Sequence, residues 1–205
     1  MIAIVDYGAG NLQSVKNALD FIGAESVVTA DAAIIESADG VILPGVGSFG
    51  DAMNSMKASG LVEAVKNAAV SGKPFLGICL GLQLLFESSE ESPDVEGLCV
   101  LKGKILKIPD AGLKVPHMGW NSLEIKKKEG IFKDTPQNTY VYFVHSYYLA
   151  AANEAEVAAK TFYGVSIDAA VSSGNLFGVQ FHPEKSGDLG LQMLRNFIAL
   201  CGGAK

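Results

Sequence analysis

The chain has 205 residues, of which 49% are hydrophobic, and it carries a formal net charge of −6. This length is enough to bury a sizeable core, and we expect a single domain over residues 1–205. The acidic balance supplies no basic patch, so neither nucleic acid nor an anionic membrane is an expected partner. Apolar stretches are interrupted well before the roughly 20 residues that a transmembrane helix needs.

Cysteine usage and the first residues bear on the compartment. The three cysteines, Cys79, Cys99 and Cys201, are scattered through the chain and lack metal-ligand spacing. The first residues lack the basic region and cleavage site of a signal peptide. We therefore expect a cytoplasmic protein with free thiols and with neither a metal nor another cofactor.

Strand and helix patterns alternate over the first 87 residues. Short apolar runs predict strands over residues 2–5, 26–29, 40–43 and 74–78. Apolar residues at helical spacing predict helices over residues 12–22, 49–59, 61–71 and 80–86. This alternation predicts a three-layer α/β fold, with a mostly parallel central sheet flanked by helices.

The pattern changes at residue 88. Residues 88–96 are acidic and polar, which predicts an exposed loop. Between residues 99 and 170, β-branched and aromatic residues become frequent and alternate, which predicts an added region of mainly antiparallel strands. Lys126, Lys127 and Lys128 are interpreted as a solvated hairpin end. A buried strand over residues 176–181 and a final helix over residues 191–201 complete the chain.

Cys79 lies between a predicted strand and a predicted helix, with Gly77 two residues before it and Gly81 two residues after it. This is the pattern of a nucleophile elbow, a tight turn that holds one reactive side chain above the sheet. The start of the helix favours the Cys79 thiolate, and the N–H of Leu80 is a candidate oxyanion donor. Gln83 lies one turn later, so its carboxamide is expected above Cys79, where it could bind an amino-acid substrate. The alternative is a cysteine that serves only as a small buried hydrophobe.

A histidine and an acidic residue follow the predicted strand over residues 176–181. Because Pro183 favours an extended conformation for the residue before it, His182 and Glu184 are expected to project to the same side. This arrangement predicts a catalytic base with its orienting carboxylate. His117 and His145 lack an acidic residue two positions away, and we interpret each as a loop or surface histidine.

A glycine-rich segment over residues 44–50 follows a buried strand. A plain turn or a phosphate loop are alternatives, although neither GxGxxG nor GK[ST] is present. Next to a reactive cysteine, the N–H of Val46 is a candidate oxyanion donor. Because glycines flank Val46, its peptide plane can reorient, and we hypothesise that the oxyanion hole stays incomplete until a partner sets it.

The motif over residues 77–83, together with His182, Pro183 and Glu184, resembles the class I, triad-type glutamine amidotransferases. Further motifs resemble one family among them, the glutaminase subunits of imidazole glycerol phosphate synthases. These motifs span residues 6–11, 44–47, 116–121, 143–147 and 181–186. The resemblance extends over essentially the whole chain, in the same order.

The resemblance implies that L-glutamine is hydrolysed to glutamate and ammonia through a thioester on Cys79. The ammonia would pass to a separate (β/α)8-barrel cyclase subunit in a heterodimer, which makes imidazole glycerol phosphate and an aminoimidazole carboxamide ribotide in histidine biosynthesis. It also implies a glutamine site at Gly47, Gln83, His145 and Ser146. The implied partner interface contains Asn11, Pro116, Met118, Trp120 and Lys185. From the sequence alone, Trp120 could equally be a core residue.

Two other functions remain open at this stage. A free-standing cysteine hydrolase of the same fold, such as a γ-glutamyl peptidase, would hydrolyse its substrate without a partner. A non-catalytic binding or scaffold subunit could have the same fold, although the presence of Cys79, His182 and Glu184 argues against that function.

Overall fold

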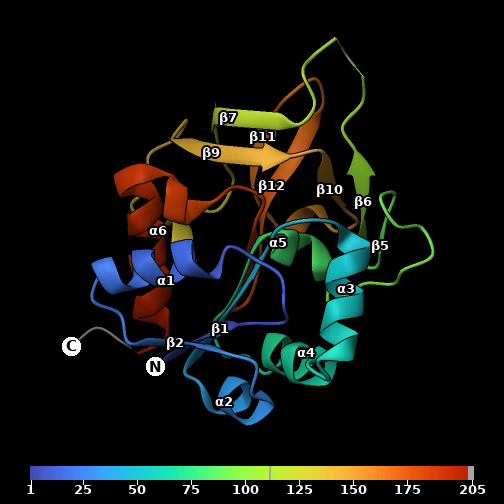
Figure 1. Cartoon of the computed structure of the whole chain (residues 1–205). Coiled ribbons are helices and arrows are strands. Elements are labelled where there is room, and N and C mark those ends of the chain that lie inside the picture. Colours follow the sequence, from blue (N-terminus) through green and yellow to red (C-terminus); the bar gives the residue numbers. More distant parts are fainter. Residues whose placement is uncertain (111, 203–205) are drawn as a thin grey trace.

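The computed structural model describes residues 1–110 and 112–202, and within them the largest sheet has eight strands (Figure 1). The strand order is β2-β1-β3-β4-β13-β12-β11-β8. The neighbours from β2 to β13 pair in parallel, and those from β13 to β8 pair antiparallel. The parallel strands are β1 (Ile2–Val5), β2 (Ser26–Thr29), β3 (Gly40–Gly45), β4 (Phe75–Cys79) and β13 (Leu176–Val179). The antiparallel ones are β12 (Ser166–Ser173), β11 (Val157–Phe162) and β8 (Glu124–Ile125).

Helices cover both faces of this sheet. Helices α1 (Leu12–Phe21) and α6 (Gly187–Leu200) lie on one face; α2 (Ala32–Ser37), α3 (Phe49–Ala58), α4 (Val62–Val70) and the short α5 (Leu80–Leu84) lie on the other (Figure 1). Strand β1 shows the alternation: Ile2 and Ile4 pack with α1 and α6, whereas Ala3 and Val5 pack with the opposite helices. The predicted three-layer α/β architecture is confirmed.

Besides β8, β11 and β12 of the large sheet, two smaller sheets contribute to the added, mainly antiparallel region. Strands β6 (Gly103–Lys107), β10 (Tyr147–Ala151) and β5 (Ser88–Ser89) form one of them, in which β5 and β6 pair in parallel. Strands β7 (His117–Ser122) and β9 (Tyr140–His145) form an antiparallel ribbon at the top of Figure 1. The described part of the chain also contains three 3₁₀ turns: η1 (Gly130–Phe132), η2 (Glu154–Glu156) and η3 (Pro183–Lys185).

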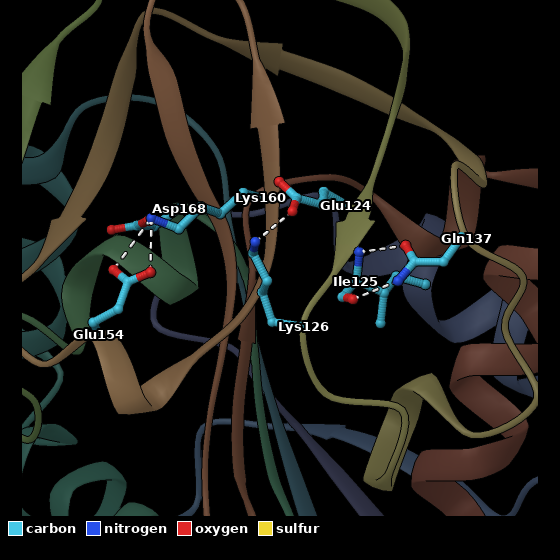
Figure 2. Close-up of polar contacts among 7 residues, drawn as sticks. All are labelled: Glu124, Ile125, Lys126, Gln137, Glu154, Lys160 and Asp168. Carbon is cyan, nitrogen blue, oxygen red and sulfur yellow. Dashed lines mark hydrogen bonds and ion pairs between the residues drawn. The ribbon is translucent and has the colours of Figure 1, made fainter.

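Polar contacts tie the antiparallel edge strands together (Figure 2). The Lys160 ammonium on β11 lies 3.2 Å from Asp168 on β12 and 3.0 Å from Glu154. The Gln137 carboxamide accepts from the Ile125 N–H at 2.8 Å and donates to the Ile125 carbonyl at 2.6 Å. Gln137 therefore serves as a hydrogen-bonding partner for the edge strand β8, whose backbone groups would otherwise lack one on that side.

The structure corrects several details. Helix α2 was not predicted; its six residues have one buried side chain, and Asp31 caps it by accepting from the Ala33 N–H at 2.8 Å. Helix α5 ends at Leu84 instead of residue 86, and the predicted loop over residues 88–96 contains β5. The hairpin interpretation of the three lysines is wrong, because they follow β8, whose partner is β11. Lys127 instead donates to the Ser172 carbonyl at 2.9 Å.

No helix within the described residues is sufficiently long and apolar to cross a membrane.

Candidate active site

Three parallel strand ends meet at the site. Strand β4 pairs with β3 on one side, which places Gly45 opposite Cys79, and with β13 on the other, which places Val179 opposite Ile78. Because parallel strands end at the same edge of a sheet, the segments that follow β3 and β13 lie beside Cys79. This topology brings together segments about a hundred residues apart in the chain.

The turn at Cys79 has the geometry of an elbow. Cys79 has a φ of +55° and a ψ of −108°, a conformation that costs an L-residue about 1–3 kcal/mol and persists where packing enforces it. A Cβ at Gly81 would lie 1.8 Å from the Leu43 carbonyl oxygen, and one at Gly77 would lie 2.7 Å from the Gly81 oxygen. The two glycines are therefore required for the close approach of α5 to the sheet, which agrees with the elbow pattern that they indicate in the sequence.

A pocket of about 340 Å³ opens beside the elbow, within the range typical of small-molecule sites. It is lined by the predicted nucleophile and base, by both predicted oxyanion residues and by all the predicted glutamine-site residues: Cys79, His182, Val46, Leu80, Gly47, Gln83, His145 and Ser146. Glu184 is not part of the lining, because it lies behind His182.

Glu91 also lines this pocket and was missed in the sequence, where it belonged to the predicted exposed loop. Its carboxylate accepts from the Phe49 N–H, the first amide of α3, at 2.8 Å. This contact joins segments 42 residues apart, and no local pattern in the sequence indicates it. The pocket thus contains one carboxylate that sequence reasoning did not assign.

His182 and Glu184 form a buried pair. The His182 Nδ1–H donates to Glu184 Oε1 at 2.8 Å, and the two side chains are only 2% and 1% exposed. The predicted extended geometry is only half right: His182 is extended, but Pro183 to Lys185 form the 3₁₀ turn η3. The carboxylate therefore reaches the ring through a tight turn and not through the two-residue period of a strand.

Electrostatics favour a charged imidazole at this position. Burial lowers the pKa of His182, but interactions with Cys79 and Glu184 outweigh it and raise this pKa to about 9. Among the described residues, the other ring nitrogen, Nε2, has no hydrogen-bond partner. A protonated imidazole beside a cysteine stabilises the thiolate, which is the reactive form of the nucleophile.

The backbone of His182 is held by the β7–β9 ribbon. Its N–H donates to the Tyr142 carbonyl on β9 at 2.9 Å. The Ser186 hydroxyl donates to the His182 carbonyl at 2.6 Å and accepts from the Tyr142 N–H at 3.0 Å. The backbone of His182 is thus held at both its N–H and its carbonyl group.

His117 and His145 are buried strand residues, so their interpretation as loop or surface histidines is wrong. They lie opposite each other in the ribbon, with His117 Nδ1 at 2.9 Å from His145 Nε2. His145 Nδ1 lies 3.0 Å from the Tyr147 carbonyl, which only accepts, so Nδ1 carries the proton and Nε2 accepts from His117. Burial lowers the pKa of His117 to about 4 and that of His145 to about 3, and both rings are neutral at pH 7.

Gln83 is also more constrained than the sequence suggested. Its Nε2 donates to the Tyr147 carbonyl and to Gln180 Oε1, both at 3.0 Å, so both amide hydrogens are already used. Only Oε1 remains to accept from a ligand in the pocket. Gln83 therefore lines the same pocket as Cys79, and it offers a ligand an acceptor and not a donor.

The predicted interface residues lie on neighbouring elements. Met118 and Trp120 are 59% and 54% exposed on the outer side of β7, so Trp120 is not a core residue. Pro116 lines the pocket just before β7. Lys185 is exposed in η3, which packs against both α1 and β9, and Asn11 immediately precedes α1. No cluster with the composition of a metal site occurs in residues 1–110 and 112–202.

Comparisons with known proteins agree with this geometry. The family model described as glutamine amidotransferase class-I matches residues 3–201. The protein named imidazole glycerol phosphate synthase subunit HisH from Methanothermobacter thermautotrophicus is 52% identical over 200 residues, which cover 98% of each chain. The protein of the same name from Moorella thermoacetica is 52% identical over 196 residues, covering 96% of this chain and 93% of that one.

Solved structures show the same fold. One, described as a crystal structure of glutamine amidotransferase, superposes with a TM-score of 0.77 at 21% identity and covers 98% of this chain and all of that one. PurLQS from Thermotoga maritima superposes with a TM-score of 0.72 at 22% identity, covering 97% of each chain. This chain belongs to the class-I glutamine amidotransferases and, within them, to the family of the imidazole glycerol phosphate synthase subunit HisH.

Proposed function

We propose that this chain hydrolyses L-glutamine to glutamate and ammonia at Cys79 and supplies the ammonia to a cyclase subunit in histidine biosynthesis. The buried His182–Glu184 pair beside a strained cysteine, in a pocket of suitable size, carries this proposal. Family membership supports the same reaction. We also propose that residues 1–205 act as one domain and that the protein works in the cytoplasm.

The acylation step follows from the charges of the pair. The Cys79 thiolate attacks the side-chain amide carbon of glutamine, and the N–H groups of Val46 and Leu80 stabilise the oxyanion that forms. The His182 imidazolium then protonates the departing nitrogen, so that ammonia leaves and a thioester remains.

Deacylation reverses the role of the base. Neutral His182 takes a proton from water, and the resulting hydroxide attacks the thioester carbonyl. Glutamate leaves, Cys79 returns to the thiolate and His182 is again protonated. Glu184 accepts from Nδ1–H throughout, so it orients the ring and stabilises its charge.

Four residues would hold the substrate, namely Gly47, Gln83, His145 and Ser146. The Gln83 oxygen and the Glu91 carboxylate are the acceptors in the pocket that suit an α-ammonium group. His145 already uses both ring nitrogens, toward His117 and the Tyr147 carbonyl, so it would shape the pocket without donating to substrate.

The proposed partner is a (β/α)8-barrel cyclase that forms a heterodimer with this chain. It would dock on the exposed side of β7, at Met118 and Trp120, with Asn11, Pro116 and Lys185 nearby. Exposed Met and Trp side chains are typical of protein interfaces. A sealed interface is also required chemically, because ammonia released to water at neutral pH becomes ammonium, which is not a nucleophile. We also propose that this partner sets the peptide plane of Val46, which is followed by Gly47 at a φ of +96°.

The test uses Cys79→Ala in the complex with the cyclase. Glutamine-dependent synthesis should be lost, whereas synthesis from added ammonium salt should persist, because the cyclase site is untouched. Cys99→Ala, which removes an exposed thiol, is the matched control and should retain both activities. Loss of both activities in the Cys79 variant would contradict the proposed division of labour. Full glutamine hydrolysis by the chain without its partner would instead favour a free-standing hydrolase.

A further inference from the structure

Gln180 has no role in the mechanism above, yet its side chain lies beside the nucleophile. It immediately follows the end of β13, two residues before His182, and it is completely buried, with 0% of the residue exposed. Its backbone N–H donates to the Ala169 carbonyl on β12 at 2.8 Å, which fixes the main chain. Its side-chain Nε2 lies 3.7 Å from Cys79 Sγ, in hydrogen-bonding geometry for sulfur.

The orientation of the Gln180 carboxamide is determined by its neighbours. Gln83 Nε2 lies 3.0 Å from the Tyr147 carbonyl oxygen, which can only accept, so this position must be the amide nitrogen. The second hydrogen of the same nitrogen requires an acceptor, and the atom 3.0 Å away is Gln180 Oε1. With its oxygen toward Gln83, Gln180 must present its N–H to Cys79. A flipped carboxamide would place two donors against each other.

An amide donor aimed at sulfur acts differently on the two protonation states of Cys79. A thiol is a weak acceptor, whereas a thiolate is a strong one, so the N–H stabilises the charged form preferentially. Gln180 is fully buried and Cys79 is only 7% exposed, so water competes little with such a charge-assisted hydrogen bond.

The other titratable groups around Cys79 do not replace this donor. His182 is the cation of the site. Tyr7 is buried, and its hydroxyl donates to the Pro44 carbonyl at 3.1 Å instead of to sulfur. His145 is neutral, and the Glu91 carboxylate that lines the same pocket opposes negative charge on Cys79.

We propose that Gln180 stabilises the Cys79 thiolate through its Nε2–H, and that Gln83 and the Tyr147 carbonyl hold it in that orientation. This inference rests on the proposed role of Cys79 as the nucleophile. It gives Gln83 a second task beside substrate binding. It also means that the segment that supplies the base supplies a second group that activates the nucleophile.

The experiment compares two substitutions that differ in chemistry at nearly constant shape. Gln180→Met removes the donor, and Gln180→Glu replaces it with a carboxylate oxygen. Gln192→Met on α6 is the matched control, because Gln192 donates to Asn196 within that helix. The rate of Cys79 alkylation by iodoacetamide is measured against pH on the full chain, with the modified cysteine identified by peptide mass spectrometry.

The pH midpoint of Cys79 alkylation should rise by about one unit in Gln180→Met, since hydrogen bonds to charged groups have this strength. It should rise further in Gln180→Glu, and it should not move in Gln192→Met. If Gln180 had only a structural role, its substitution would lower thermal stability but would leave the pH midpoint of Cys79 alkylation in the folded protein unchanged. An unchanged midpoint in the Met variant would overturn the proposal.

If the Met variant does not fold, the isosteric Glu variant decides the question by the same criterion. Failure of both variants to fold would assign Gln180 a structural role and would also overturn the proposal. The proposed function fails separately: in the parent chain, a Cys79 no more reactive than the exposed Cys99 would remove the nucleophile itself. If Cys79 is reactive in the parent chain but its alkylation midpoint does not move in the Gln180 variants, only the role of Gln180 is refuted.

Discussion

The chain contains three histidines, and the structure predicts that they titrate in three different ranges. Burial lowers the pKa of His117 to about 4 and that of His145 to about 3. For His182, burial is outweighed by Cys79 and Glu184, which raise the pKa to about 9. The perturbation that tests this difference is a change of pH, applied to the parent chain and to one histidine variant.

The sign of the effect follows from proton linkage. Below about pH 6.5, the unfolded chain protonates His117 and His145 while the folded chain keeps them neutral, so acid favours unfolding. At about pH 5, 1.5 units below the unfolded pKa, each histidine removes about 2 kcal/mol of unfolding free energy. The stabilisation from His182 is fully present below about pH 6.5 and is lost as the pH rises through about 9. Among the histidines, the loss of unfolding free energy in acid therefore comes from His117 and His145.

Histidine-selective NMR provides the assay, because the parent chain has three histidines and each gives one Hε1 ring signal. Two signals should keep the chemical shifts of neutral imidazole down to about pH 5, and the third should titrate near pH 9. Urea unfolding of the parent and of His117→Gln then measures the free energy of unfolding across the same range. Ring signals of His117 and His145 that titrate near pH 6.5, or equal acid sensitivity in both proteins, would refute the reasoning.

Two substitutions test the elbow and the exposed ribbon. Gly81→Ala places a Cβ 1.8 Å from the Leu43 oxygen, and both atoms belong to rigid elements. We therefore expect the free energy of unfolding, measured with urea, to fall by at least about 2 kcal/mol. An unchanged urea midpoint would show that α5 can move away from the sheet. Trp120→Ala should weaken binding to the cyclase at least tenfold by calorimetry, because a half-exposed tryptophan buried on docking is a typical hot spot. Val70→Ala, also at an exposed apolar residue but on α4, is its control, and equal affinities for the two variants would place the interface elsewhere.

The elbow was predictable because its requirements are local. The strand, the cysteine and the helix are contiguous in the sequence. Gly77 and Gly81 indicate a close approach of the helix to the sheet, because a Cβ at either position would clash. The meeting of Cys79 with His182 required one further rule, that parallel strands end at the same edge, and the pairing of β4 with β13 satisfies it. The contact between His182 and Glu184 was anticipated for a reason that is only partly correct, because the intervening turn is 3₁₀ and not extended.

The groups that sequence reasoning missed depend on contacts between distant segments. Glu91 is held at the pocket because its carboxylate accepts from the first amide of α3. Gln180 presents its N–H to Cys79 because Gln83, held by the Tyr147 carbonyl, binds the oxygen end of the Gln180 carboxamide. Neither residue lies in a pattern with a characteristic spacing. Their chemistry becomes visible only when donors and acceptors are matched in three dimensions.

The ribbon of β7 and β9 shows why the histidines and Trp120 were the hardest residues to interpret. Its register pairs His117 with His145 and Trp120 with Tyr142, and alternate residues point to opposite sides. The inner side therefore buries the two histidines next to the pocket, whereas the outer side exposes Trp120. In the sequence, the aromatic and β-branched alternation of β9 indicates a strand, whereas β7 shows no such alternation, because only one side of the ribbon is buried. Since the Tyr142 backbone also holds His182, the exposed side and the proposed catalytic base depend on one pair of strands.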